Sequence, residues 1–67
     1  MVNIMLERIK ALREDNDLSQ KEVAKMLNIA QRTYSGYETG TRAIPVAVLI
    51  ELAKFYNVSL DWICGLK

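Results

Sequence analysis

The sequence predicts a single all-α domain built from five short helices, and three observations support this prediction. The 67 residues are enough for one domain. Apolar residues recur at helical spacing in successive segments, and no segment shows the strict alternation that is typical of a half-buried strand. Residues that favour helix ends, namely serine, asparagine, glycine and proline, separate these segments.

The first helix is predicted over residues 4 to about 15. Met5, Ile9 and Leu12 recur at i, i+4 and i+7, which places them on one face of a helix. Charged side chains fall largely on the other face. The run that ends this helix, residues 14–17, is rich in residues that favour turns over helix interiors.

A second, short helix begins after Ser19. Ser19 and Glu22 have the spacing of a capping box, in which each side chain accepts a hydrogen bond from the other residue's backbone N–H. The apolar face of this helix stops at Asn28, one of the few residue types that tolerates a left-handed backbone. These signals predict a tight turn into a third helix over about residues 30–38.

The remaining helix ends are marked by turn-forming and capping residues. Gly40 ends the third helix as a left-handed cap. Pro45 opens a fourth helix in its first turn, where a missing N–H costs nothing, and Asn57 ends that helix. Ser59 caps a last short helix over residues 60–64, and a glycine follows it.

The composition argues against an enzyme. The chain has no histidine and a single cysteine, Cys64, so disulfides, the usual zinc clusters and cysteine–histidine or serine–histidine pairs are absent from the sequence. No apolar stretch approaches the roughly 20 residues of a membrane span, and no signal peptide is evident. We therefore expect a cytoplasmic protein without a metal, a cofactor, a small-molecule ligand or a membrane contact.

Charge is nearly balanced over the whole chain but not along it. The net charge is +1, which by itself argues mildly against nucleic acid as a partner. Between positions 20 and 42, however, four basic residues face only two acidic ones, Glu22 and Glu38. A locally positive face on a neutral protein would limit non-specific binding to DNA. The four basic residues are Lys21, Lys25, Arg32 and Arg42.

Residues 20–39 have the three features that two helices need to meet at a steep angle across a short turn. A small residue, Ala24, stands where the helices would cross, and Asn28 supplies the turn. Apolar side chains follow at matched spacing, and Tyr34 and Tyr37 share their face. Because of this spacing we expect both tyrosines in the core, with the Tyr34 hydroxyl near the surface, rather than on nucleic acid.

Three landmarks occur in order along the chain: Leu18-Ser19-Gln20, then Tyr37-Glu38-x-Gly40, then Asn57-Val58-Ser59-Leu60-Asp61. With them the sequence closely resembles the Cro/CI-type (XRE) family of phage and bacterial helix-turn-helix regulators over nearly its whole length. The resemblance implies a five-helix, phage-repressor-like DNA-binding domain over residues 1–67, with its helix-turn-helix at about 20–39. It further implies a sequence-specific transcriptional regulator, expected to be a repressor. Such a protein binds a pseudo-palindromic operator in double-stranded DNA as a homodimer, with the third helix in the major groove.

The resemblance also implies which residues contact DNA. Gln31 and Arg32 match the main base-reading positions, and their chemistry suits adenine and guanine respectively. Ser35 adds a shorter base contact. Gln20 matches a position that touches a phosphate and braces the base readers. The expected backbone contacts, which set register without reading sequence, are Gln20, Thr33, Thr41 and Arg42.

Arg13 and Glu38 match a pair that forms a structural salt bridge in some relatives. Two positions depart from the family pattern. Gly36 stands where many relatives carry a long polar or basic side chain, so we expect the backbone there to approach DNA more closely. Ala30 stands where a capping serine or threonine is common, so the third helix is expected to begin poorly capped.

The last helix is expected to be too short to bury all its apolar side chains. Cys64 is expected to be an inert, buried hydrophobe. Some of the others would then form a dimer face, for which the candidates are Trp62, Ile63 and Leu66.

A second hypothesis is a protein-interaction module, such as an antitoxin-like partner with weak or no DNA binding. The near-neutral charge and the glycine at position 36 favour it slightly. Joint substitution of Gln31 and Arg32 would discriminate, because a repressor would lose operator binding while an adaptor would lose nothing. An enzyme is the least favoured class, because no nucleophile–base pair or phosphate-binding glycine loop is present in the sequence.

Overall fold

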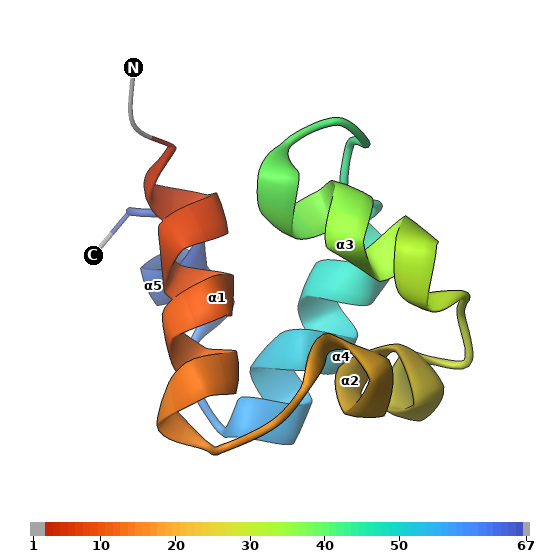
Figure 1. The fold of residues 1–67 in the computed structure, drawn as a ribbon. Helices are drawn as coiled ribbons and strands as arrows, with labels where there is room; N and C mark the ends of the chain where they lie inside the picture. Colours follow the sequence, from red (N-terminus) through yellow and green to blue (C-terminus); the bar gives the residue numbers. More distant parts are fainter. Residues whose placement is uncertain (1–2, 67) are drawn as a thin grey trace.

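The computed structural model describes residues 3–66, and all five predicted helices are present (Figure 1). Within this range there is no strand, so the all-α prediction is confirmed. The helices are α1 (Ile4–Asp15), α2 (Gln20–Leu27), α3 (Gln31–Thr39), α4 (Val46–Tyr56) and α5 (Leu60–Ile63).

The predicted capping box at the start of α2 is confirmed. The Glu22 backbone N–H donates to the Ser19 hydroxyl oxygen at 3.0 Å, and the Ser19 N–H donates to the Glu22 carboxylate at 2.9 Å. At the other end of α2, Asn28 adopts the left-handed conformation with φ of 59°. The Ile29 N–H then donates to the Ala24 carbonyl at 2.9 Å, which turns the chain sharply into α3.

Several helix boundaries differ by one residue from the prediction, and α3 spans Gln31–Thr39 rather than about residues 30–38. Pro45 does not lie in the first turn of α4 but at the position before it, because its ψ of 147° is extended rather than helical. Its carbonyl nevertheless accepts the first helical hydrogen bonds, from Val48 and Leu49. The last helix ends at Ile63, and Cys64 serves as its C-terminal cap. Gly40 and Asn57 end their helices as predicted, and both are left-handed, with φ of 83° and 56°.

One core joins all five helices. α3 packs against both α1 and α2, while α5 packs against α1 and α4. Figure 1 shows α1 and α5 side by side, with α2 and α3 on the opposite side of the molecule. Each helix contributes a side chain that is at most 1% exposed: Ile9, Val23, Tyr34, Leu52 and Ile63.

No helix between residues 3 and 66 is long and apolar enough to cross a membrane. In the same range, no cluster of cysteine and acidic side chains has the grouping that could hold a metal ion.

Candidate nucleic-acid interface

The first turn of α3 presents two of the predicted base-reading side chains. Gln31 and Arg32 are both exposed there, and Ser35 follows one turn later, half-buried. As predicted, no side chain caps this end of the helix, since Ala30 occupies the N-cap position in an extended conformation. An exposed amide and an exposed guanidinium at the start of the second helix of this motif have the placement needed to reach base edges in a major groove.

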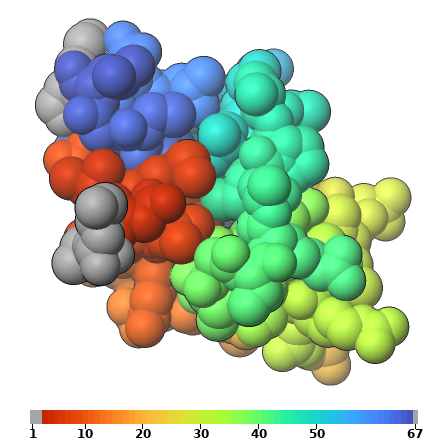
Figure 2. Space-filling view, turned by 90° about the horizontal axis from the view of Figure 1, so that it is seen from above, coloured from red at the N-terminus to blue at the C-terminus, as the bar shows by residue number. Residues whose placement is uncertain are grey.

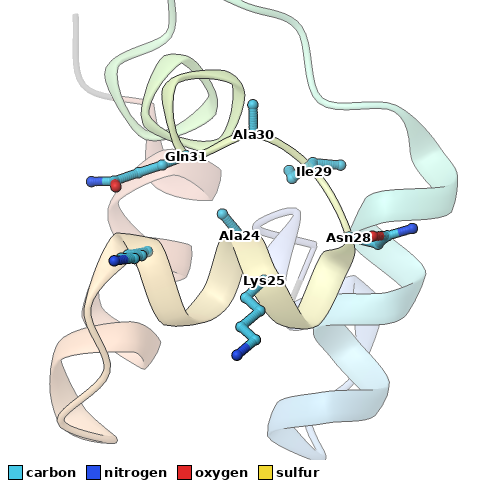
Figure 3. A pocket seen from close by; sticks show the side chains of 7 residues that line it. Ala24, Lys25, Asn28, Ile29, Ala30 and Gln31 are labelled. Atoms are coloured by element: carbon cyan, nitrogen blue, oxygen red, sulfur yellow. The ribbon is translucent and has the colours of Figure 1, made fainter.

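A wide, shallow hollow of about 470 Å³ lies beside this turn, between α2 and the start of α3 (Figure 3). Its floor is apolar, because Ala24 is 2% exposed and lies beneath the turn. Lys21, Lys25 and Gln31 stand around it, and the amide of Gln31 extends outward from α3. Ala24 is thus buried beside the turn between the two helices, where the sequence predicts a small residue.

A buried carboxylate holds the start of α2 and the end of α3 together. The side chain of Glu38 is 2% exposed and forms a two-pronged ion pair with Arg13. Arg13 Nε lies 2.7 Å from Glu38 Oε2, and Arg13 Nη2 lies 3.1 Å from Oε1. A third nitrogen of Arg13 donates to the Leu18 carbonyl at 2.9 Å. The salt bridge implied by the family resemblance is therefore present, and it joins α1 to α3.

Gln20 belongs to the same network. Its amide nitrogen donates to Glu38 Oε1 at 3.1 Å, so its side chain is bound to Glu38 rather than to the base-reading residues. An amide nitrogen has two N–H donors, so one donor is left for a phosphate oxygen. The structure therefore places Gln20 as an anchored side chain at the start of α2.

The surroundings of Glu38 set its pKa. Burial raises the pKa of Glu38, but hydrogen bonds from Arg13 and Gln20 stabilise the charged form, and the net pKa lies below the ordinary value. The pKa of Arg13 is raised, chiefly by its hydrogen bond to Glu38. Both groups therefore stay charged at neutral pH.

The loop after α3 packs against α3 at Gly36. Figure 2 shows the loop, in green to teal, beside the green and yellow-green surface of α3. The Arg42 backbone N–H donates to the Gly36 carbonyl at 3.1 Å, and the Thr41 hydroxyl lies 3.4 Å from the same oxygen. Gly36 is buried as a result. The expectation that its backbone approaches DNA is therefore wrong, because residues 41 and 42 cover it.

The other predicted phosphate-contacting residues differ in exposure. Thr33 is half-buried on α3, whereas Thr41 and Arg42 are exposed in the loop. Four cations stand exposed on α2, α3 and this loop, and none of them forms an ion pair with any residue in the range 3–66. They are Lys21, Lys25, Arg32 and Arg42.

Both tyrosines of α3 are core residues, as expected. Tyr34 is 0% exposed and Tyr37 is 7% exposed, and their rings meet edge to face with centroids 6.4 Å apart. The expectation that the Tyr34 hydroxyl lies near the surface is wrong. That oxygen is fully buried, and burial raises the pKa of Tyr34 far above its ordinary value.

The predicted dimer face on α5 is wrong for one of its three residues. Ile63 is 0% exposed because it faces the core between α1 and α4, so it cannot contact a second molecule. Trp62 is half-buried, with the guanidinium of Arg8 stacked 4.4 Å from the ring centroid and bonded to the Trp62 carbonyl. Leu66 is 76% exposed. Cys64 is only half-buried, so its expected full burial is also wrong.

Comparison with known proteins adds independent information on this arrangement. A family model described as helix-turn-helix matches residues 9–63. An uncharacterized HTH-type transcriptional regulator of Bacillus subtilis, YobD, is 37% identical over 60 residues, which cover 90% of this chain and 54% of that protein. The cryptic phage CTXphi transcriptional repressor RstR of Vibrio cholerae is 40% identical over 53 residues, covering 79% of this chain and 48% of RstR.

A further relative is the antitoxin PezA of Streptococcus pneumoniae, which is 34% identical over 59 residues, covering 88% of this chain and 37% of PezA. The chain thus spans about half the length, or less, of these curated relatives. No solved structure matches the chain significantly.

Proposed function

This chain belongs to the XRE-type helix-turn-helix family of transcriptional regulators, and we propose that it is a sequence-specific DNA-binding unit that acts in repression. The observation that carries this proposal is the placement of Gln31 and Arg32. Both are exposed in the first turn of α3, where a helix entering the major groove meets base edges. A regulator of this kind works on chromosomal or phage DNA, which in a bacterium lies in the cytoplasm.

The assignment of contacts follows the chemistry of each side chain. Gln31 pairs with adenine and Arg32 with guanine, each contributing about 1–3 kcal/mol of discrimination against the wrong base. Ser35 lies one turn further along the same helix. Backbone contacts come from the start of α2, from α3 and from the loop after it, through Gln20, Thr33, Thr41 and Arg42.

One recognition helix reads only a few base pairs, so the proposed unit on DNA is a homodimer. Two copies with their third helices about 34–36 Å apart would read a pseudo-palindromic operator. Of the residues in and after α5 that are expected at the dimer face, Trp62 and Leu66 keep enough exposure to take part. Such a protein needs no catalytic group, and the family is one of DNA-binding regulators, which are generally not enzymes.

The proposal is tested by fluorescence anisotropy with random duplex DNA at about 50 and 200 mM salt. The wild type is expected to bind with a steep loss of affinity as salt rises, and Gln31→Ala/Arg32→Ala is expected to bind more weakly. Lys54→Ala is the matched control, because it removes one exposed positive charge from α4 rather than from α3. Flat, weak binding by all three proteins would refute the DNA-binding proposal.

A protein-interaction module, such as an antitoxin-like partner, is the second candidate. It is favoured by the 34% identity to PezA, which is named an antitoxin, and by the net charge of +1. This candidate predicts little salt-dependent DNA binding. It also predicts that a protein partner binds Gln31→Ala/Arg32→Ala as tightly as the wild type.

A further inference from the structure

Gly36 occupies the middle of α3, where glycine is unfavourable. Glycine inside a helix is less favourable than alanine, because it loses more backbone freedom on folding. Its φ is not in the left-handed region, so backbone conformation does not require glycine here. The reason for glycine at this position must therefore lie in what packs against it.

The packing partner is the aliphatic stem of Arg42. A Cβ atom at position 36 would lie 2.9 Å from Arg42 Cδ, 3.0 Å from Arg42 Cγ and 3.1 Å from the Thr41 hydroxyl oxygen. These distances are well inside ordinary van der Waals contact, which begins at about 3.5 Å. The Arg42 stem therefore lies in space that any other residue at position 36 would fill with its own side chain.

The guanidinium group of Arg42 remains available to a binding partner. Arg42 is exposed, and its guanidinium forms no ion pair or hydrogen bond within residues 3–66. Its backbone is fixed by the hydrogen bond from the Arg42 N–H to the Gly36 carbonyl at 3.1 Å. A long side chain loses rotamer freedom when it binds, and a stem that is already packed has less to lose.

We propose that Gly36 is a positioning residue for Arg42: its missing side chain lets the arginine stem lie against α3 and holds the guanidinium beside the recognition helix for a DNA phosphate. This inference rests on the proposed DNA-binding function. It gives the glycine a role opposite to the one suggested by the sequence, since its effect on DNA comes through a covering side chain rather than through an open backbone.

A double-mutant cycle tests the proposal, with affinity for random duplex DNA measured at about 50 mM salt. Arg42→Ala is expected to weaken binding about tenfold, as the loss of one charge-assisted contact. Gly36→Ala is expected to weaken binding by roughly threefold or more, because its methyl group displaces the stem. In the Arg42→Ala background, Gly36→Ala is expected to have no further effect. Thermal unfolding of each variant checks that the fold is kept.

A second measurement needs no DNA. The ¹⁵N–{¹H} NOE of Arg42 Nε in the free protein is expected to show a restricted side chain in the wild type and a mobile one in Gly36→Ala. Arg32 serves as the internal control, because it is exposed on α3 and forms no ion pair or hydrogen bond within residues 3–66, and its Nε is expected to be mobile in both proteins.

Two results would overturn the positioning role alone. In one, the wild type binds DNA and Gly36→Ala either leaves that affinity unchanged or lowers it by the same factor in the wild-type and Arg42→Ala backgrounds. In the other, Arg42 Nε is as mobile in the wild type as in Gly36→Ala. A wild type without salt-dependent DNA binding would instead overturn the proposed function and, with it, the role of Arg42 on DNA.

Discussion

At the scale of single residues, the buried ion pair between Arg13 and Glu38 joins α1 to α3. The side chain of Arg13 is 13% exposed and that of Glu38 is 2% exposed, so folding removes most of the water around both charged groups. Attraction and hydrogen bonds offset that desolvation only while both partners are present. We expect Arg13→Met to lower the free energy of unfolding by about 3 kcal/mol, because it leaves Glu38 charged and buried.

The paired variant Arg13→Met/Glu38→Met provides the comparison. It removes both charges, so it is expected to be more stable than Arg13→Met alone in urea unfolding followed by circular dichroism. Losses that simply add in the double variant would contradict the account, because they would show that the two charges do not depend on one another.

The lowered pKa of Glu38 predicts a dependence of stability on pH. Burial opposes the charged form, but hydrogen bonds from Arg13 and Gln20 outweigh it and bring the folded pKa below the ordinary 4.5. The resulting stabilisation is fully present above the pKa of the unfolded chain, and it is lost as pH falls through the lower folded pKa. The melting temperature of the wild type is therefore expected to decrease once the pH is lowered below about 4.5.

Glu38→Gln separates this contribution from the others. It is expected to be less stable than the wild type at pH 7 and to lose less stability on acidification. Part of the acid response will persist, since the capping-box hydrogen bonds with Ser19 also lower the pKa of Glu22. An identical acid response in Glu38→Gln and the wild type would show that Glu38 is not a source of it.

Tyr56 carries a buried hydroxyl oxygen with no hydrogen-bond partner among residues 3–66. Such a hydroxyl group loses its hydrogen bonds to water on folding and gains no hydrogen bond within this range to replace them. Tyr56→Phe removes the oxygen and keeps the ring, which packs edge to face on Phe55 at 5.0 Å. We expect the free energy of unfolding to stay the same or to rise by up to about 1 kcal/mol in urea unfolding. A loss larger than this would mean that the hydroxyl has a partner.

At the scale of elements, the two helices of the motif begin in different ways. α2 begins at Ser19 with a complete capping box, whereas α3 begins at Ala30 with no side-chain cap. Ala30 already has the extended backbone of an N-cap, with φ of −68° and ψ of 144°. Ala30→Ser is therefore expected to raise the free energy of unfolding by about 0.5–1 kcal/mol, measured by urea unfolding.

Ser19→Ala is the matched control at the start of α2, and it is expected to lower the free energy of unfolding by about 1 kcal/mol. No gain in Ala30→Ser would indicate that the first N–H groups of α3 are satisfied by another group. If Ala30→Ser changes the free energy of DNA binding more than the free energy of unfolding, the new serine hydroxyl contacts DNA directly.

The helix ends were predictable because the signals that set them are local. The Ser19–Glu22 spacing, Asn28 and Gly40 each determine their own turn, and all three behave as predicted. What the sequence could not show is which side chain covers which. The shortness of the last helix suggests Ile63 as part of a dimer face, yet Ile63 is buried because α5 packs against α1 and α4.

The same limit applies to the candidate site. Gln31 and Arg32 lie exposed in the first turn of α3, and their place in that turn follows from the predicted start of the helix. The sequence alone suggests an open stretch of backbone at Gly36, and only the course of the loop after α3 shows that Arg42 covers it. The signal in the sequence was the glycine itself, which is costly inside a helix and needs a packing reason.

At the scale of the whole molecule, the net charge is small but the basic residues are placed unevenly. The chain carries a net charge of +1, yet its exposed cations on α2, α3 and the following loop lack ion pairs within the described range. We therefore expect weak binding to DNA of random sequence and tight binding only where base contacts are also made. Specificity should therefore rest on α3, and a second copy would be needed to extend it.

The measurement that tests this account most directly is a ¹H–¹⁵N NMR titration of the wild type with duplex DNA. We expect the largest shifts at Gln20, along residues 31–35 and at 41–42, with little change along α4. That pattern would place α3 and its flanking loop on DNA. Shifts confined to α4 and α5, or none at all, would contradict the claim that α3 is the DNA-binding element.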